Sequence, residues 1–192
     1  MCPNLTIIIP SETVRSYSNK KIKEITSGKE RLDVIARCLV NVTRAAKRMN
    51  YYTRFILYLS HPKEKKALVI PVNDLCISSE LDAIIYLITL FKQNNKIIKL
   101  KQKNFEDLLL QETKDASLFY LHPMGIHISN LSKLIQPTDS LVFVIGSQTD
   151  LTQDQEKLLY KLGSTKISLG NKEYLASHVI TLLLYELYHI FY

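Results

Sequence analysis

An apolar run, Leu141–Ile145, constrains the fold of this chain more than any other feature of its sequence. The run has no polar member and is rich in β-branched side chains, a pattern typical of a strand that is buried on both faces. Such strands occur mainly in parallel sheets that carry helices on both sides. The run therefore predicts an α/β protein with a mostly parallel sheet and flanking helices.

Similar short runs recur along the chain and alternate with stretches of helical periodicity. This alternation is expected where crossover helices join parallel strands. The chain has 192 residues and 46% apolar content, which is enough for one substantial core, so we expect a single domain over residues 1–192. The predicted strands are Thr6–Ile9, Arg54–Leu59, Leu68–Ile70, Ile97–Leu100, Ser117–Leu121, Leu141–Ile145 and Thr165–Ile167.

Apolar residues at steps of three and four predict helices between these strands. The opposite face of the clearest helix carries three arginines, Arg37, Arg44 and Arg48. Its buried face is predicted to consist of Leu32, Ile35, Leu39, Val42 and Ala46.

Further helices are expected to begin near Ser79, Asn104 and Thr152, because short polar side chains at these positions can cap a helix N-terminus. Thr152 and Gln155 also have the spacing of a capping box. The last helix is predicted from about Tyr174 to Phe191. It has few polar positions, so it should be buried or lie in a subunit interface.

Several classes of protein are disfavoured by what the sequence lacks. No apolar run reaches the roughly 20 residues of a membrane span, and Ile7–Ile9 followed by Pro10 does not resemble a signal peptide. The three cysteines, Cys2, Cys38 and Cys76, fit neither a disulfide framework nor a zinc site. We therefore expect reduced thiols, a cytoplasmic protein and no membrane association.

Metal and nucleotide chemistry also have little support. The histidines show no metal-ligand spacing, which predicts no metal. Glycines are too few for a phosphate-binding loop or a dinucleotide fingerprint. The net charge of +7 favours a polyanionic partner such as RNA, although a basic structural or protein-interaction module has the same composition.

Three segments, taken in order, carry a resemblance to a known family. They are Arg31–Cys38, then Phe119–His122 with Gly125, and then Val142–Gly146 leading through Leu151 and Thr152 to Ser168–Gly170 and Leu175–His178. This ordered set, together with Asn104–Asp107, resembles the archaeal tRNA (pseudouridine-54 N1)-methyltransferase family of the SPOUT superfamily. The resemblance covers essentially the whole chain.

The resemblance implies an S-adenosylmethionine (SAM)-dependent enzyme that methylates N1 of pseudouridine in the tRNA T-loop. It also implies a homodimer and a deep C-terminal trefoil knot, which no pattern of periodicity could predict. The alternative is a divergent SPOUT protein that acts on another RNA site, or an inactive RNA-binding dimer.

A cofactor site is also compatible with the residues themselves. A buried strand that ends in Gly146 brings bare backbone to the carboxyl edge of a parallel sheet, where α/β proteins commonly bind ligands. Three loops at strand ends can converge there on one adenosine. With the resemblance, the predicted cofactor-binding residues are Leu121, Ile145, Gly146, Leu151, Ser168, Leu169, Gly170, Asn171, Lys172, Glu173, Leu175, Ser177 and Val179.

The RNA side of the predicted site lies on the arginine-bearing helix. By resemblance, Asp33 and Arg37 are the candidate catalytic residues, with Asp33 a proton acceptor or an orienting group. The candidate RNA-binding residues are Arg31, Arg37, Arg44 and Arg48. The simpler interpretation of Asp33 and Arg37 is an ordinary ion pair at the favourable four-residue spacing.

Two histidines also admit two interpretations. His178 can support the cofactor loop or be a satisfied core residue, and His122 can face the pocket or bond locally. The sequence also departs from the family pattern. Acidic residues are expected where Ile126 and His127 stand, and aspartate and histidine where Ser147 and Gln148 stand. Val179 replaces a cysteine, and Glu30 replaces a glycine.

Overall fold

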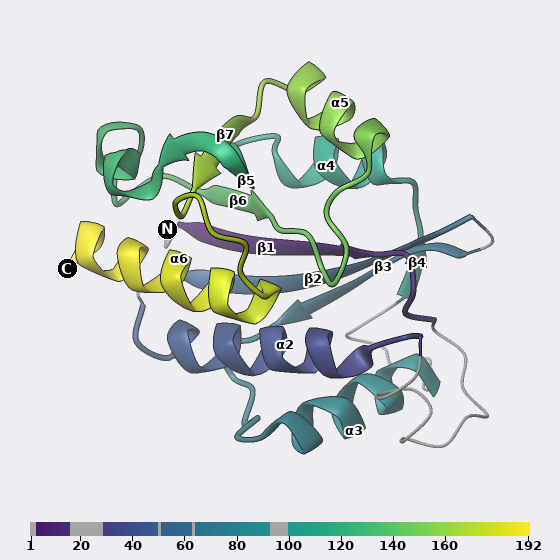
Figure 1. Ribbon diagram of the computed structural model, residues 1–192. Helices are drawn as coiled ribbons and strands as arrows, with labels where there is room; N and C mark the ends of the chain where they lie inside the picture. The colour runs from purple at the N-terminus through teal and green to yellow at the C-terminus, as the bar shows by residue number, and fades with distance from the viewer. Residues whose placement is uncertain (1–2, 16–28, 50, 63, 93–99) are drawn as a thin grey trace.

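Among the described residues, seven strands form one sheet (Figure 1). The computed structural model describes residues 3–15, 29–49, 51–62, 64–92 and 100–192. The sheet order is β4-β3-β2-β1-β6-β5-β7, and only β3 runs against its neighbours. The strands are β1 (Asn4–Ser11), β2 (Tyr52–His61), β3 (Glu64–Pro71), β4 (Leu100–Gln102), β5 (Ser117–His127), β6 (Leu141–Val144) and β7 (Thr165–Ser168).

Helices cover both faces of this sheet (Figure 1). One face carries α2 (Leu32–Ala46), α3 (Glu80–Lys92) and α6 (Ala176–Phe191), together with the short 3-10 helix η1 (Ile128–Lys133). The other face carries α4 (Phe105–Glu112) and α5 (Gln153–Lys161). The predicted α/β class and the mostly parallel sheet with flanking helices are confirmed.

The central strands are buried on both faces, as their apolar sequences predict. Ile7 and Ile9 of β1 pack under α2 and α6, while Ile8 between them points to the opposite core under α4 and α5. In β6, Phe143 and Val144 are likewise divided between the two cores. This alternation follows from the two-residue period of a strand.

The predicted boundaries agree with the structure in several places. α2 runs from Leu32 to Ala46, and the predicted capping box of α5 is present, with Gln155 N–H donating to Thr152 Oγ1 at 3.2 Å and Thr152 N–H to Gln155 Oε1 at 2.9 Å. The strand predicted at Ile97–Leu100 lies partly outside the described residues, and β4 begins at Leu100.

Several predicted strand ends differ from the structure, including that of β3, which begins at Glu64 and not at Leu68, and two further boundaries matter for the site. The last helix begins at Ala176 instead of Tyr174, because Leu175 has extended backbone angles and ends a loop. β5 continues six residues beyond the predicted end at Leu121, to His127. Both corrections fall at the carboxyl edge of the sheet. The trefoil knot implied by the resemblance stays a prediction.

The topology places the carboxyl ends of five neighbouring parallel strands, β2, β1, β6, β5 and β7, at one edge of the sheet. β1 lies between β2 and β6, so the chain builds the sheet outward in two directions from β1. In open α/β sheets, ligands bind outside the carboxyl ends of strands where the order reverses in this way.

Candidate cofactor and RNA site

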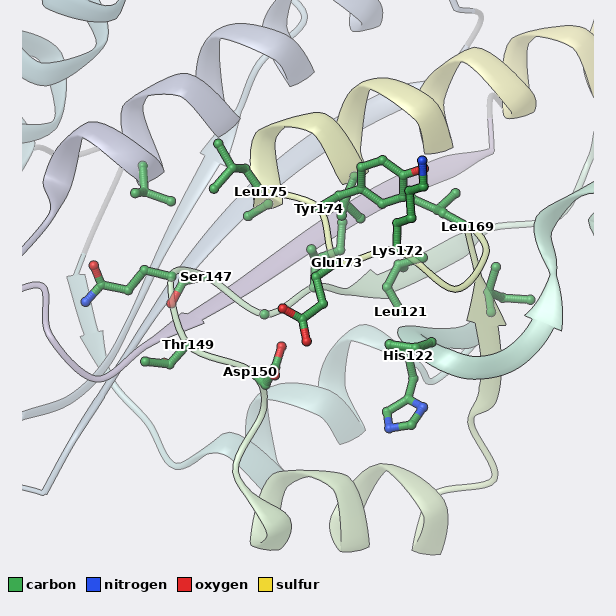
Figure 2. A pocket seen from close by; sticks show the side chains of 18 of the residues that line it. Leu121, His122, Ser147, Thr149, Asp150, Leu169, Lys172, Glu173, Tyr174 and Leu175 are labelled. Carbon is green, nitrogen blue, oxygen red and sulfur yellow. The ribbon is translucent and has the colours of Figure 1, made fainter.

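A cavity of about 710 Å³ opens at the carboxyl ends of β5, β6 and β7 (Figure 2). Small-molecule sites commonly have volumes of roughly 300–1,000 Å³. The starts of α2 and α6 complete its wall. The lining residues are Arg31, Val34, Leu121, His122, Pro123, Ile145, Gly146, Ser147, Gln148, Thr149, Asp150, Ile167, Leu169, Gly170, Lys172, Glu173, Tyr174, Leu175, Ala176 and Val179.

The first wall is an interruption of β5. Leu121 and Ile126 both stand opposite Ile167 of β7, so the residues between them leave the ladder. His122, in the displaced segment, lines the cavity. Gly125 allows the strand to rejoin β7, because an added Cβ would lie 2.6 Å from the backbone of Ile167. The detour therefore depends on a residue without a side chain.

The second wall is the loop between β7 and α6, which Ser168 ties to the first. Ser168 Oγ lies 2.9 Å from the carbonyl oxygen of Pro123, and it accepts a hydrogen bond from Gly170 N–H at 3.0 Å. Gly170 has a φ of +107°, which L side chains rarely adopt. Ser168 thus links the β5 wall to the loop between β7 and α6. Its own side chain does not line the cavity.

The third wall is the loop that follows β6. An added Cβ on Gly146 would lie 3.1 Å from the carbonyl oxygen of Thr149, so the loop turns tightly over the glycine. Gln148 Nε2 donates to Thr13 Oγ1 at 2.9 Å, which joins this loop to the segment that follows β1. Gln148 is one of the departures from the family pattern, and its amide has a structural partner.

Two carboxylates, of Asp150 and Glu173, line the cavity together with the basic side chains of Arg31 and Lys172. Figure 2 shows Glu173 and Asp150 with their carboxylates directed toward one another across the opening, and His122 below them. His122 Nδ1 accepts a hydrogen bond from Met124 N–H at 3.1 Å, and His122 Nε2 lies 3.9 Å from Glu156 Oε1. An accepting Nδ1 places the proton of a neutral imidazole on Nε2.

Asp33 is held by two arginines at the start of α2. Arg31 donates to both of its oxygens, from Nε at 2.9 Å and from an Nη at 3.0 Å, and Arg37 Nη2 donates at 2.7 Å. Burial alone raises the pKa of Asp33, but the hydrogen bond and charge of Arg31 and the charge of Arg37 outweigh it and lower the pKa below its usual value. The predicted ion pair at four-residue spacing is therefore present.

Of this cluster, only Arg31 reaches the cavity. Arg31 lines the cavity wall and has a left-handed backbone, with a φ of 50°. Asp33 and Arg37 lie beside it on α2. Arg44 and Arg48 lie toward the far end of the helix, where Arg44 Nη2 donates to the carbonyl oxygen of Ser78 at 2.6 Å. The four candidate RNA-binding arginines therefore extend along α2 away from the cavity.

Most of the predicted cofactor-binding residues meet at this cavity. Four of them do not line it: Leu151 packs toward the core under α4 and α5, Asn171 is exposed, Ser168 acts behind the wall, and Ser177 is buried in α6. The predicted residues that do line it are Leu121, Ile145, Gly146, Leu169, Gly170, Lys172, Glu173, Leu175 and Val179.

Some lining residues had no signal in the sequence. Val34 and Pro123 reach the cavity through the packing of α2 and the detour of β5, which depend on contacts between distant segments. Asp150 lies two residues before Thr152, the N-cap of α5, so the sequence predicts that it is in a loop but not that it lines the cavity. Of the two histidines with two interpretations, His122 lines the cavity and His178 is exposed on α6.

Other expectations concern metals, thiols and membranes. Within the described ranges, no group of three or more His, Cys, Asp or Glu side chains is placed to hold a metal ion. Cys38 and Cys76 are free thiols, and burial raises the pKa of Cys38 to about 12, while Cys2 lies outside the described residues. No helix in the described part of the chain is long and apolar enough to span a bilayer.

Comparison with solved structures identifies a protein of the same fold. The structure of Archaeoglobus fulgidus Nep1 bound to S-adenosylhomocysteine superposes with a TM-score of 0.65, covering 99% of both chains at 12% identity. At that identity the likeness shows a shared fold and nothing finer.

Sequence comparison finds several curated relatives, of which two are described here. The tRNA (pseudouridine(54)-N(1))-methyltransferase of Methanococcus aeolicus is 29% identical over 96 residues, which cover 48% of this chain and 47% of the relative. The protein of the same name from Methanococcus maripaludis strain C5 is 26% identical over 188 residues, covering 91% of this chain and 93% of the relative. The chain thus aligns with about half of the first relative and nearly all of the second.

A family profile also matches nearly the whole chain. The family described as "Putative SAM-dependent RNA methyltransferase" matches residues 6–190. Those bounds include most of β1, the arginine-bearing α2 and all three walls of the cavity. The chain therefore belongs to this family of SAM-dependent RNA methyltransferases.

Proposed function

We propose that this chain uses SAM to methylate N1 of pseudouridine in the T-loop of tRNA. The observation that carries the proposal is the cavity in which the ends of β5, β6 and β7 meet. Family membership supports the methyl donor, and the names of the relatives support the base and the RNA. Cytoplasmic location and an archaeal type of enzyme belong to the same proposal.

The residues of the cavity suit this cofactor. Leu121, Ile145 and Leu175 provide apolar surfaces for an adenine ring, and Gly146 and Gly170 bring backbone without side chains to the cavity wall. The carboxylates of Asp150 and Glu173 favour the positive charge of a sulfonium. When bound, SAM supplies an activated methyl group and a neutral leaving group, so the protein contributes mainly alignment and exclusion of water.

Asp33 acts best as an orienting group. A carboxylate whose pKa is lowered stays ionised at neutral pH and is a weak base, and Asp33 does not line the cavity. It fixes Arg31 at the cavity wall and Arg37 on the neighbouring surface. We assign these two arginines to the RNA, where a guanidinium can bind a phosphate with two hydrogen bonds.

A homodimer is part of the same proposal. Leu175, just before α6, and Leu182 of α6 are exposed to 57% and 38%, and apolar side chains exposed close together are typical of interaction surfaces. A second subunit on this face would cover them beside the cavity.

Ile126 and His127 stand where the resemblance leads us to expect an acidic pair. Two alternatives to the proposed activity are therefore tested as well. A divergent enzyme would methylate another RNA position, and an inactive RNA-binding dimer would bind RNA without methyl transfer. The deciding experiment measures incorporation of labelled methyl groups from SAM into T-loop transcripts with pseudouridine or uridine at the target position. We expect labelling of the pseudouridine transcript only. Equal labelling contradicts the base specificity, and no labelling of either, with intact cofactor binding, supports the inactive RNA binder.

A further inference from the structure

A chain of hydrogen bonds connects the third wall of the cavity to the turn before α2. Gln148, in the loop that follows β6, donates from Nε2 to Thr13 Oγ1 at 2.9 Å and to the carbonyl oxygen of Lys29 at 3.5 Å. Thr13 Oγ1 in turn donates to the carbonyl oxygen of Glu30 at 3.0 Å. Three segments that are distant in the sequence therefore meet at these bonds.

The donors and acceptors of these bonds match in one arrangement. A threonine hydroxyl has one proton and accepts through its lone pairs. Because a carbonyl oxygen can only accept, the proton of Thr13 points to Glu30, and Thr13 accepts from Gln148. The carbonyl oxygen of Lys29 also requires a donor, so the Gln148 amide presents its NH2 group to both partners.

The bonds end on the peptide unit that precedes Arg31. The carbonyl group of Glu30 belongs to that peptide, and Arg31 has a φ of 50°. Among the described residues other than glycine, Arg31 is the one with a positive φ. Such a backbone costs free energy and persists where surrounding contacts hold it. Thr13 provides such a contact, because its bond to the Glu30 carbonyl fixes the plane of the peptide about which φ of Arg31 is set.

The other end of the bonds lies at the cofactor cavity. Gln148 lines the cavity with its neighbours Ser147, Thr149 and Asp150, which Figure 2 shows along one side of the opening. A ligand that packs against this loop favours the loop position that it contacts. It therefore also favours the position of Gln148 in which the bonds to Thr13 and Lys29 form.

We infer that Gln148 and Thr13 are positioning residues that couple the binding of SAM to the binding of RNA. SAM holds the loop after β6, and the bonds of Gln148 and Thr13 hold Arg31 in the orientation that meets the RNA. The inference rests on the proposed function, because it takes SAM and RNA as the two ligands and Arg31 as an RNA contact.

Coupling of this kind is reciprocal. Each ligand should tighten the binding of the other by the same factor, because the coupling free energy belongs to the pair of sites. One hydrogen bond that forms in the doubly bound state and not in the free protein corresponds to a factor of about five.

Direct contact between Arg31 and the cofactor is the competing route, because Arg31 also lines the cavity. Asp33 already holds the Arg31 guanidinium through Nε at 2.9 Å and an Nη at 3.0 Å, so the backbone of Arg31 is the part that remains to be oriented. Thr13 does not line the cavity. A change at Thr13 therefore tests the route through the hydrogen bonds without removing a cofactor contact.

The test measures binding of a fluorescein-labelled T-loop stem-loop to the full chain by anisotropy, without and with saturating S-adenosylhomocysteine, which has no methyl group to transfer. Wild-type protein should bind the RNA about fivefold more tightly when this ligand is present. Thr13→Val keeps the shape and removes the hydroxyl, and Gln148→Leu removes the amide, so each should reduce the factor to about one. Because both act through the same bonds, the double variant should lose no more coupling than either single variant.

Two controls keep the coupling. Thr13→Ser restores the hydroxyl and should recover the wild-type factor, which a general loss of packing at this position would not do. Gln153→Leu removes an exposed glutamine from α5 on the other face of the sheet and should leave the factor unchanged. Calorimetric titration of S-adenosylhomocysteine with and without RNA should give the same factor as the anisotropy.

Each other outcome overturns the inference. Wild-type coupling in both Thr13→Val and Gln148→Leu, with or without a lower Tm, assigns the bonds to stability alone and the coupling to direct contact. Equal RNA affinity of the wild type with and without the ligand excludes coupling altogether. If circular dichroism shows that Thr13→Val is unfolded, Gln148→Leu decides alone, because Gln148 lies on the surface. Wild-type protein that binds neither ligand contradicts the proposed function, whereas binding of both without coupling contradicts this inference only.

Discussion

Gly125 lies against the backbone of Ile167 so closely that a Cβ would come within 2.6 Å of its carbonyl carbon. The contact joins the detour of β5 to β7 at the cavity wall. Gly125→Ala should therefore push the two strands apart and destabilise the fold by about 1–3 kcal/mol, with a weaker response to SAM. Urea denaturation and SAM-dependent melting measure both effects. Met124→Ala is the control, because Met124 is 83% exposed, and equal stability of the two variants argues against the close contact.

Ser168 provides a second test of the cavity walls. Ser168→Ala removes the hydrogen bonds to Pro123 and Gly170, which should cost about 1–2 kcal/mol of stability and raise the Kd for SAM. Ser164 is a matched control, because its hydroxyl donates to the carbonyl oxygen of Leu159 at 2.7 Å, away from the cavity. Ser164→Ala should lose comparable stability and keep SAM affinity. Calorimetric titration of both variants distinguishes them, and parallel losses of affinity count against a positioning role.

Asp33 predicts a pH dependence of stability. Its pKa is lower in the folded chain than in the unfolded chain, so the stability that it contributes is full above the unfolded pKa of about 3.9 and is lost as pH falls through the folded pKa. Asp33→Asn should therefore reduce stability by about 1 kcal/mol at pH 7, with the difference from wild type disappearing in acid. Asp154→Asn, on a side chain that is 97% exposed, should change neither. A constant difference between pH 7 and pH 2 contradicts this account.

Arg37 tests the RNA side of the site. Arg37→Ala should weaken RNA binding and reduce the slope of log K against log salt by about 0.7–0.9, while SAM affinity stays unchanged. Lys157→Ala on α5 removes one exposed positive charge from the opposite face and serves as the control. Anisotropy titrations over a series of salt concentrations provide the slopes. An unchanged slope assigns Arg37 to its ion pairs with Asp33 and Glu80 and not to the RNA.

Local signals in the sequence were sufficient for most of the fold. The apolar period from Leu32 to Ala46 gave α2 its bounds, and Thr152 with Gln155 gave the start of α5, because both depend on residues within a few turns. The antiparallel direction of β3 was not predicted. The short link between His61 and Glu64 was the available signal, since strands joined so closely form a hairpin.

The candidate site was harder to predict because its walls come from distant segments. In the detour of β5, Leu121 and Ile126 both pair with Ile167 of β7. This pairing is between distant segments, and no local pattern in the sequence predicts it. Leu175 continues an apolar helical period, yet it is extended where the loop meets α6, so periodicity placed the helix start too early. The resemblance identified the three loops, and the structure shows which of their residues line the cavity and that Ser168 lies behind the wall.

Calorimetric titration of SAM into the purified chain tests the central claim most directly, with Gly146→Val measured beside the wild type. A side chain on Gly146 would press on the carbonyl oxygen of Thr149, 3.1 Å from its Cβ, and displace one wall of the cavity. We expect one SAM to bind per wild-type chain, and affinity at least about tenfold weaker in the variant while its circular dichroism stays native. Absence of SAM binding to the wild-type chain, or equal affinity in the two proteins, would contradict the proposal that this cavity holds the methyl donor.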